Sequence, residues 1–333
     1  MTPDRIVRLR KRLARRLIDA WETIRDRPSG RAVRAVRDAA DPLVHASWVA
    51  ATWLRTRDPT TLNDKVKYKM LHDRRPILTT LTDKVDVRDV VRDRIGVDHL
   101  THLFQVHDDP AAVRWDELPR EFACKVTHAS GGTIIVTDSA DPDRPLPTRL
   151  VPGHGRLVVH PDAFDPDRAT GIVRAWLSRR YGWSGWKREW AYLGVRPRVL
   201  VEEFLGGSAG AIPSDYKLFV FDGTCRFVQL DLDRHGDHRR DVYTPDWERL
   251  PVDYNYPRAD VPSARPERLD EMIAIAERLG EGHDFVRVDL YALPSRVVFG
   301  ETTFYPAWGT ATFDPPEYDR ILGSWWTVPA RYL

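Results

Sequence analysis

The sequence contains little cysteine and no long apolar segment. Only two cysteines occur among the 333 residues, and neither belongs to a Cys-x-x-Cys pair, so we expect free thiols in a reducing compartment. The longest candidate apolar run, residues 46–54, is much shorter than the roughly 18 to 20 residues of a membrane-spanning helix. The N-terminus also lacks an apolar stretch followed by a small-residue cleavage site, which argues against a secretory signal. We therefore expect a cytoplasmic protein.

Positive charge is concentrated at the start of the chain. Residues 1–37 contain 12 Arg and Lys but only four Asp and Glu, a net charge of +8, whereas the whole chain carries +2. Apolar residues recur there every three or four positions, which predicts a basic amphipathic helix. Two interpretations stay open: peripheral contact with anionic lipid on the inner membrane face, or packing on the protein body with a solvated basic face. No nucleic-acid motif or aromatic stacking pattern is present, so no nucleic-acid partner is expected.

The rest of the chain mixes helical and strand patterns, which indicates an α/β (α+β) fold class. The length suggests about two domains, and 42% hydrophobic residues suffice for packed cores. Strands are expected at residues 122–126, 133–136, 156–160, 197–205, 216–221 and 226–230, and an amphipathic helix at residues 266–279.

A small-residue loop joins the strands predicted at residues 122–126 and 133–136. It reads Thr-His-Ala-Ser-Gly-Gly at residues 127–132, and such glycines allow backbone N–H groups to approach phosphate oxygens. Lys125 alternates with its apolar neighbours and is expected to point at the same ligand. No Gly-Lys-Ser/Thr follows and no helix begins here, so the loop is neither a Walker A nor a Rossmann motif. A plain hairpin turn is the alternative.

The most informative segment is a hairpin predicted over residues 285–306. Its first strand alternates so that Arg287 and Asp289 share one face. If the second strand presents Glu301 to that face, two carboxylates meet beside an arginine. Mg²⁺ bound by carboxylates and substrate phosphates is a common form of such a site. An ordinary amphipathic hairpin with a polar outer face is the alternative.

The same alternation makes a prediction about the second strand of this hairpin. Without any irregularity, Glu301 and Thr303 share a face with Val297 and Phe299.

Six segments in order resemble the ATP-grasp superfamily. They are TDK at 82–84, FACKVTHASGG at 122–132, RVLVEEFL at 198–205, DYKLFVFDG at 215–223, FVRVDLY at 285–291 and GETTFYP at 300–306. The order looks most like the TupA-like ATP-grasp proteins, the branch named for teichuronopeptide biosynthesis. The resemblance covers about residues 60–325 and implies an ATP-grasp fold that holds a nucleotide between two α+β lobes. The expected parts are a basic helical N-terminal extension (1–58), a pre-grasp region (59–118), a central lobe with a glycine flap (119–205) and a C-terminal lobe with the metal-binding hairpin (206–333).

The resemblance also implies residues that bind the nucleotide. Lys84 and Lys125 would contact the ATP phosphates, and Ser130, Gly131 and Gly132 would close over them. The hinge beside adenine and ribose would comprise Glu202, Glu203 and Phe204, with one of the two acids on the ribose hydroxyls.

In the C-terminal lobe, the resemblance implies the catalytic and metal-binding groups. Lys217 would be a further phosphate contact, and Arg287 would stabilise the transferred phosphoryl group. Asp289 and Glu301 would hold Mg²⁺. Thr303 stands where the superfamily commonly has Asn and is a weaker neutral oxygen ligand, although the TupA-like branch itself carries Thr-Phe-Tyr-Pro here.

The activity that the resemblance implies is an ATP- and Mg²⁺-dependent carboxylate–amine ligase that works through an acyl-phosphate. Its expected substrates are an amino acid or peptide amine and an acidic cell-envelope polysaccharide, such as a uronic-acid acceptor, or its precursor. A polar loop that contains Arg234, His235, His238 and Arg239 is a candidate contact for this anionic acceptor. Two alternatives remain, a phosphotransferase that acts on a sugar or another hydroxyl acceptor and a non-catalytic glycan-binding module.

Overall fold

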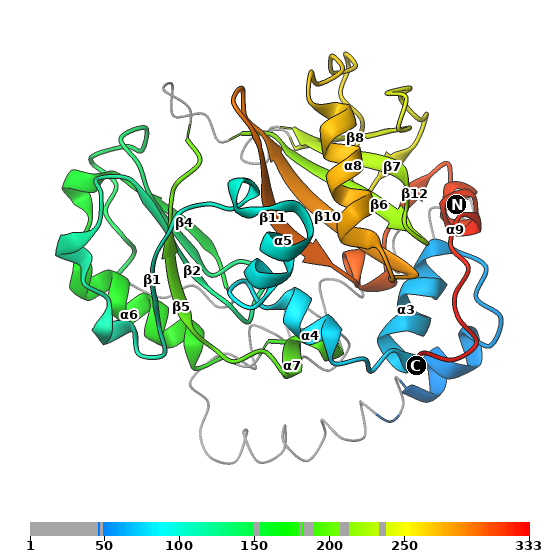
Figure 1. The fold of residues 1–333 in the computed structure, drawn as a ribbon, viewed down its shortest axis with the longest axis horizontal. Coiled ribbons are helices and arrows are strands. Elements are labelled where there is room, and N and C mark those ends of the chain that lie inside the picture. Colours follow the sequence, from blue (N-terminus) through cyan, green and yellow to red (C-terminus); the bar gives the residue numbers. More distant parts are fainter. Residues whose placement is uncertain are drawn as a thin grey trace, which may run out of the picture.

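A computed structural model describes residues 46, 49–148, 154–179, 181–182, 189–206, 213–232 and 238–333. These residues form two five-stranded sheets, side by side, with helices packed on both (Figure 1). This arrangement confirms the predicted α+β class. The basic helix predicted within residues 1–37 lies outside the described residues. Within the ranges above, no helix combines the length and apolarity that crossing a membrane requires.

The first sheet has the strand order β1-β5-β2-β3-β4. Its strands are β1 (Leu103–His107), β2 (Phe122–Val126), β3 (Thr133–Val136), β4 (Arg156–Val159) and β5 (Val199–Glu202). Helix α6 (Pro166–Leu177) packs on it through Ile172, Val173 and Trp176. Cys124 and Val126 are fully buried in the same core, so Lys125 between them projects from the opposite face.

The second sheet is antiparallel throughout and has the order β11-β10-β6-β7-β8. Its strands are β6 (Asp215–Phe221), β7 (Thr224–Leu232), β8 (Arg239–Tyr243), β10 (Phe285–Ala292) and β11 (Val297–Thr303). Helix α8 (Leu269–Gly280) lies along this sheet (Figure 1) and packs its apolar stripe, including Met272 and Ala276, into the core. Because α8 and this core cover one face, Lys217, Arg287 and Asp289, which alternate with core residues, lie on the other, polar face.

The helices that precede the first sheet pack with the second. Helices α3 (Leu62–His72), α4 (Ile77–Thr82) and α5 (Val87–Ile95) share one apolar core with β6, β7 and β10. Helix α9 (Tyr318–Ser324) joins the same core, and the short strands β9 (Asp253–Tyr254) and β12 (Phe313–Asp314) pair with each other. Helix α7 (Trp190–Leu193) precedes β5. The domain boundaries expected from the sequence stay predictions.

A β-bulge in the 285–306 hairpin decides which way its acids face. Asp289 pairs with Glu301, but the next residue, Leu290, pairs with Phe299, so Gly300 is an extra residue on β11. Phe299 therefore faces the core beside Leu290, where it is 7% exposed, and Glu301 faces the other way beside Asp289. The prediction that Glu301 and Thr303 share a face with Phe299 and Val297 is wrong, because the bulge reverses the alternation.

A buried ionic cluster fastens α3 to the second half of the chain. Lys69 Nζ lies 2.7 Å from Asp73 Oδ2 and 2.6 Å from Asp284 Oδ1, and the Lys69 and Asp73 side chains are fully buried. Trp326 Nε1 and Tyr332 Oη each donate to Asp284 Oδ2 at 3.0 Å. One carboxylate thus connects α3, the residue before β10 and the C-terminal tail.

Candidate active site

A cavity of about 610 Å³ lies between the two sheets. The turn between α4 and α5, the first sheet and the polar face of the second sheet all contribute to its wall. Its basic residues are Lys84, Lys125, Arg156, Lys217, Arg240 and Arg287, and its acidic residues are Asp215, Asp289 and Glu301. The excess of positive charge suits an anionic ligand.

The central polar residues of this wall stand in register across four strands. Asp289 on β10 pairs with Glu301 on β11 and with Lys217 on β6, and Lys217 pairs with Gln229 on β7. Side chains of paired residues in neighbouring strands project to the same face of a sheet. The strand pairing therefore assembles this row from segments far apart in the sequence.

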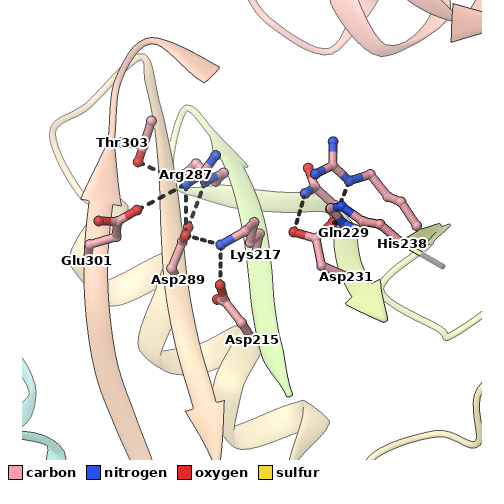
Figure 2. Close-up of polar contacts among 10 residues, drawn as sticks. Asp215, Lys217, Gln229, Asp231, His238, Arg287, Asp289, Glu301 and Thr303 are labelled. Carbon is pink, nitrogen blue, oxygen red and sulfur yellow. Dashed lines mark hydrogen bonds and ion pairs between the residues drawn. The ribbon is translucent and has the colours of Figure 1, made fainter. Parts of the chain in front are cut away.

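Arg287 and Lys217 gather the carboxylates of the row (Figure 2). Arg287 Nε donates to Asp289 Oδ1 at 2.6 Å, and its Nη2 donates to Asp289 Oδ2 at 2.8 Å and to Thr303 Oγ1 at 3.0 Å. Arg287 Nη2 also lies 3.4 Å from Glu301 Oε1. The structure brings these four hairpin residues together as the sequence predicted, while their roles stay predictions.

Lys217 joins the network from β6 and adds an acid that sequence analysis missed. Its ammonium contacts Asp289 and lies 2.5 Å from Asp215 Oδ2. Asp215 precedes Lys217 by two residues, so strand alternation places both on one face. The spacing of Asp215 and Lys217 is visible in the sequence. It indicates a site residue only together with the pairing of Lys217 with Asp289, which the sequence alone does not reveal.

Burial and neighbouring charges shift the pKa values of this network in opposite directions. Burial raises the pKa of Glu301, but Lys84, Arg287 and Lys217 together lower that pKa below its usual value. Burial raises the pKa of Asp289 to about 6, with Arg287 and Lys217 opposing. Burial lowers the pKa of Lys84, with Glu301 opposing. Asp289 is almost fully buried, so a neighbouring charge acts strongly on it, whereas the Glu301 side chain is 37% exposed and its interactions are partly screened by water.

The donor set of the hairpin fits Mg²⁺. Asp289 and Glu301 supply carboxylate oxygens from the neighbouring strands β10 and β11, and Thr303 supplies a hydroxyl beside them. Across the described residues, no group of three or more His, Cys, Asp or Glu is placed to hold a metal ion. Any Mg²⁺ held here would therefore need further oxygen ligands from substrate phosphates and water, as is common for this ion.

The predicted glycine flap connects β2 to β3. Lys84 Nζ donates to Ala129 O at 2.6 Å, and Ser130 and Gly131 line the cavity. Gly132, by contrast, donates its N–H to Gly155 O at 2.9 Å. A phosphate contact through the Gly132 amide would require that hydrogen bond to open.

Gly131→Ala should distort this flap. Gly131 has a φ of +87°, and a Cβ there would lie 2.3 Å from the backbone oxygen of His154. We expect the substitution to lower the free energy of unfolding by about 1–3 kcal/mol, measured by denaturant titration. Gly155→Ala is the matched control, because nothing lies within 4 Å of its Cβ position. Equal stability of the two variants would contradict the close packing of the flap.

The predicted adenine and ribose hinge begins at Glu202, the last residue of β5, and this first acid already has three partners. Glu202 contacts Lys125, accepts from Thr101 Oγ1 at 2.6 Å and lies 3.3 Å from Arg88. Burial raises the pKa of Glu202, but Lys125, Thr101 and Arg88 lower it below its usual value. In these contacts Glu202 positions Lys125.

The second hinge acid, Glu203, is more open. Its side chain is 38% exposed and lies 3.1 Å from Arg296. Glu202, Glu203 and Phe204 line a smaller cavity of about 70 Å³ that shares Lys84 and Lys125 with the larger one. Of the two acids, Glu203 is the better candidate for a ribose contact.

The polar loop predicted to meet an anionic acceptor is only partly described. Arg234 and His235 lie outside the described residues. His238 Nε2 lies 3.2 Å from Asp231 Oδ1, and Arg239 contacts Arg258 O at 3.4 Å. Sequence analysis missed Arg240, which lines the cavity and pairs with Asp231 on β7.

Residues 164–327 match the family model described as TupA-like ATPgrasp. The chain carries a TupA-like ATP-grasp domain. This match confirms the resemblance drawn from the motifs, and it contains Lys217, Arg287, Asp289 and Glu301. It begins after Lys125 and the glycine loop, but β5 lies within it, so the pairing of β2 with β5 and the contact of Lys125 with Glu202 connect this part of the first sheet to the matched segment.

Several solved structures are similar to this chain, but more weakly than the TupA-like family model. They include the ATP-grasp ligase PsnB with a minimal precursor (12% identity, TM-score 0.35, 68% of this chain and 54% of that one). D-alanine–D-alanine ligase from Bacillus anthracis is 13% identical, with a TM-score of 0.34 over 68% of this chain and 58% of that one. N5-carboxyaminoimidazole ribonucleotide synthetase from Thermus thermophilus is 12% identical, with a TM-score of 0.38 over 70% of this chain and 48% of that one. The chain spans about half the length of these proteins, and the likenesses add no argument to the family match. No curated protein matches the chain.

Proposed function

We propose that this protein is an ATP-dependent carboxylate–amine ligase that joins an amino acid or peptide to an acidic cell-envelope polysaccharide or its precursor. The observation that carries the proposal is the convergence of cations and paired carboxylates on one cavity. Lys217, Arg287, Asp289 and Glu301 come from the TupA-like domain, and Lys125 comes from the facing sheet.

The reaction begins with a carboxylate, which is a poor electrophile at neutral pH. A carboxylate oxygen takes the γ-phosphoryl group of ATP, which gives an acyl-phosphate and ADP. The amine nitrogen then attacks the acyl carbon, phosphate leaves with the C–O bond electrons, and the nitrogen loses a proton. Such transfer depends mainly on positioning and on neutralising charge.

The residues of the cavity match these requirements. Asp289 holds Arg287 in place, and Asp215 holds Lys217. In these positions both cations can face the transferred phosphoryl group. Asp289, Glu301 and Thr303 would hold Mg²⁺, which neutralises phosphate charge when bound. Lys84 tethers the flap at Ala129, and a closed flap would keep water from the acyl-phosphate.

The proposal is tested by Mg²⁺-dependent ADP release from ATP over panels of amino acids and uronic-acid acceptors. We expect release that needs both an amine and a carboxylate, with an amide product identified by mass spectrometry. A stable phosphorylated product formed with a hydroxyl acceptor alone would instead establish a phosphotransferase. Nucleotide binding without release for any pair would count against a ligase for these substrate classes.

A further inference from the structure

The polar face of the second sheet continues past the proposed reaction site to a cluster on β7 and β8. Arg240 pairs with Asp231 across these strands, and its Nε donates to Asp231 Oδ1 at 2.5 Å. Gln229 Nε2 donates to Asp231 Oδ2, and His238 Nε2 lies near Oδ1, both at 3.2 Å. Figure 2 shows this cluster beside the Arg287–Asp289 network. A fully buried carboxylate thus gathers three side chains, none of which the proposed reaction uses.

Arg240 is fixed from several sides and borders the cavity. Its Nη1 donates to Tyr254 O at 3.3 Å, and its guanidinium lies 5.3 Å and 4.8 Å from the ring centroids of Tyr254 and Tyr256. Asn255, between these tyrosines, is held by backbone and side-chain hydrogen bonds to Thr312 at 2.8 Å. Among the described residues, Arg240 Nη2 has no hydrogen-bond partner. An arginine that is held in this way and keeps an open donor is preorganised to bind an anion.

The cluster lies well away from the reacting groups. Arg287 and Asp289 are on β10 and Arg240 is on β8, with β6 and β7 between them. Neighbouring strands are about 4.8 Å apart, so the backbones of β10 and β8 are separated by roughly 14 Å. A peptide of several residues or an oligosaccharide is long enough to span this separation.

We propose that Arg240 binds a second anionic group, a carboxylate or a phosphate, on an extended substrate whose reacting group lies at Arg287 and Asp289. The position of the reacting group rests on the ligase function proposed above. Asp231 is a positioning residue, because it holds the Arg240 guanidinium and does not itself attract an anion. An acidic polymer or a phosphorylated precursor would present such a group, and a neutral acceptor would not.

The test measures the affinity of small anions for the full chain by ligand-observed NMR. The probes are glutarate and glycerol 3-phosphate, with glutaramide as the neutral counterpart, in the presence of Mg²⁺ and a saturating non-hydrolysable ATP analogue. Asp231→Asn/Arg240→Gln removes both charges of the pair, so no buried carboxylate is left unpaired. We expect this variant to bind the anions about 10- to 100-fold more weakly than the wild type. The probe that binds more tightly identifies carboxylate or phosphate as the ligand.

Arg258→Gln is the matched control. Arg258 pairs with Asp253 at 3.0 Å, and neither residue lines the cavity. Unchanged affinity in this control, with weakened affinity in the double variant, supports the inference. No saturable anion binding by the wild type, or equal binding by the double variant, overturns it. Binding of the ATP analogue is measured separately, and the probes are also titrated without it, so failure of the ligase proposal is distinguishable from failure of the anion subsite.

Discussion

Replacing Asp289 by asparagine is expected to lower the rate of Mg²⁺-dependent ADP release by about 10²- to 10⁴-fold. The Asp289 carboxylate accepts from Arg287 at 2.6 Å and 2.8 Å, contacts Lys217 and lies opposite Glu301. Asparagine has nearly the same size but no charge, so it removes the anion that orients two cations and would hold Mg²⁺. The measurement is the initial rate with the substrate pair that the wild type turns over fastest.

The matched control is Asp253→Asn, which also neutralises an aspartate that pairs with an arginine. Asp253 is 37% exposed as a side chain and does not line the cavity, so we expect nearly wild-type turnover. Unfolding midpoints and nucleotide affinities of both variants distinguish a lost catalytic group from a lost fold. A well-folded Asp289→Asn variant with wild-type turnover would refute the proposed role of this carboxylate.

The part of the site that could be predicted from the sequence lies within single strands and their hairpin. Alternation alone put Arg287 and Asp289 on one face, and the register of β10 with β11 then brings Glu301 opposite Asp289. The face of Glu301 relative to Phe299 was mispredicted, because a bulge at Gly300 has no reliable signal in one sequence. Glycine in a strand permits a bulge without requiring one.

The parts that could not be predicted depend on contacts between distant segments. Either Glu202 or Glu203 was expected beside ribose, and nothing in the sequence indicated that Glu202 meets Lys125 on the neighbouring strand and Arg88 from α5. Arg240 follows a predicted polar loop, but its place in the cavity depends on pairing with Asp231. Strand order and register decide such pairs, and local patterns do not encode them.

Replacing Lys69 by methionine is expected to lower the stability of the fold strongly. Lys69 is fully buried between Asp73 and Asp284, so the substitution removes a cation that faces two buried carboxylates. We expect the free energy of unfolding to fall by about 3–5 kcal/mol, measured by denaturant titration at neutral pH. Methionine fills most of the space of the lysine stem, so the loss reflects charge more than packing.

The pH dependence of stability gives a second measurement on the same cluster. Burial raises the pKa of Asp73, but Arg75 and Lys69 lower it below its usual value near 3.8. A lowered pKa in the folded state means that the stabilisation is present above the unfolded-state value and is lost as the pH falls through the folded pKa. Lys69→Met should therefore flatten the acid side of the stability profile as well as lower its plateau.

The control for the stability prediction is Arg92→Gln, which breaks the pair between Arg92 and Asp89. Those side chains are 52% and 77% exposed, so the expected cost is below about 1 kcal/mol. A similarly small loss in Lys69→Met would mean that Arg75, Trp326 and Tyr332 already satisfy Asp284 without the lysine. Attachment of α3 to the second sheet would then depend on the apolar core that they share.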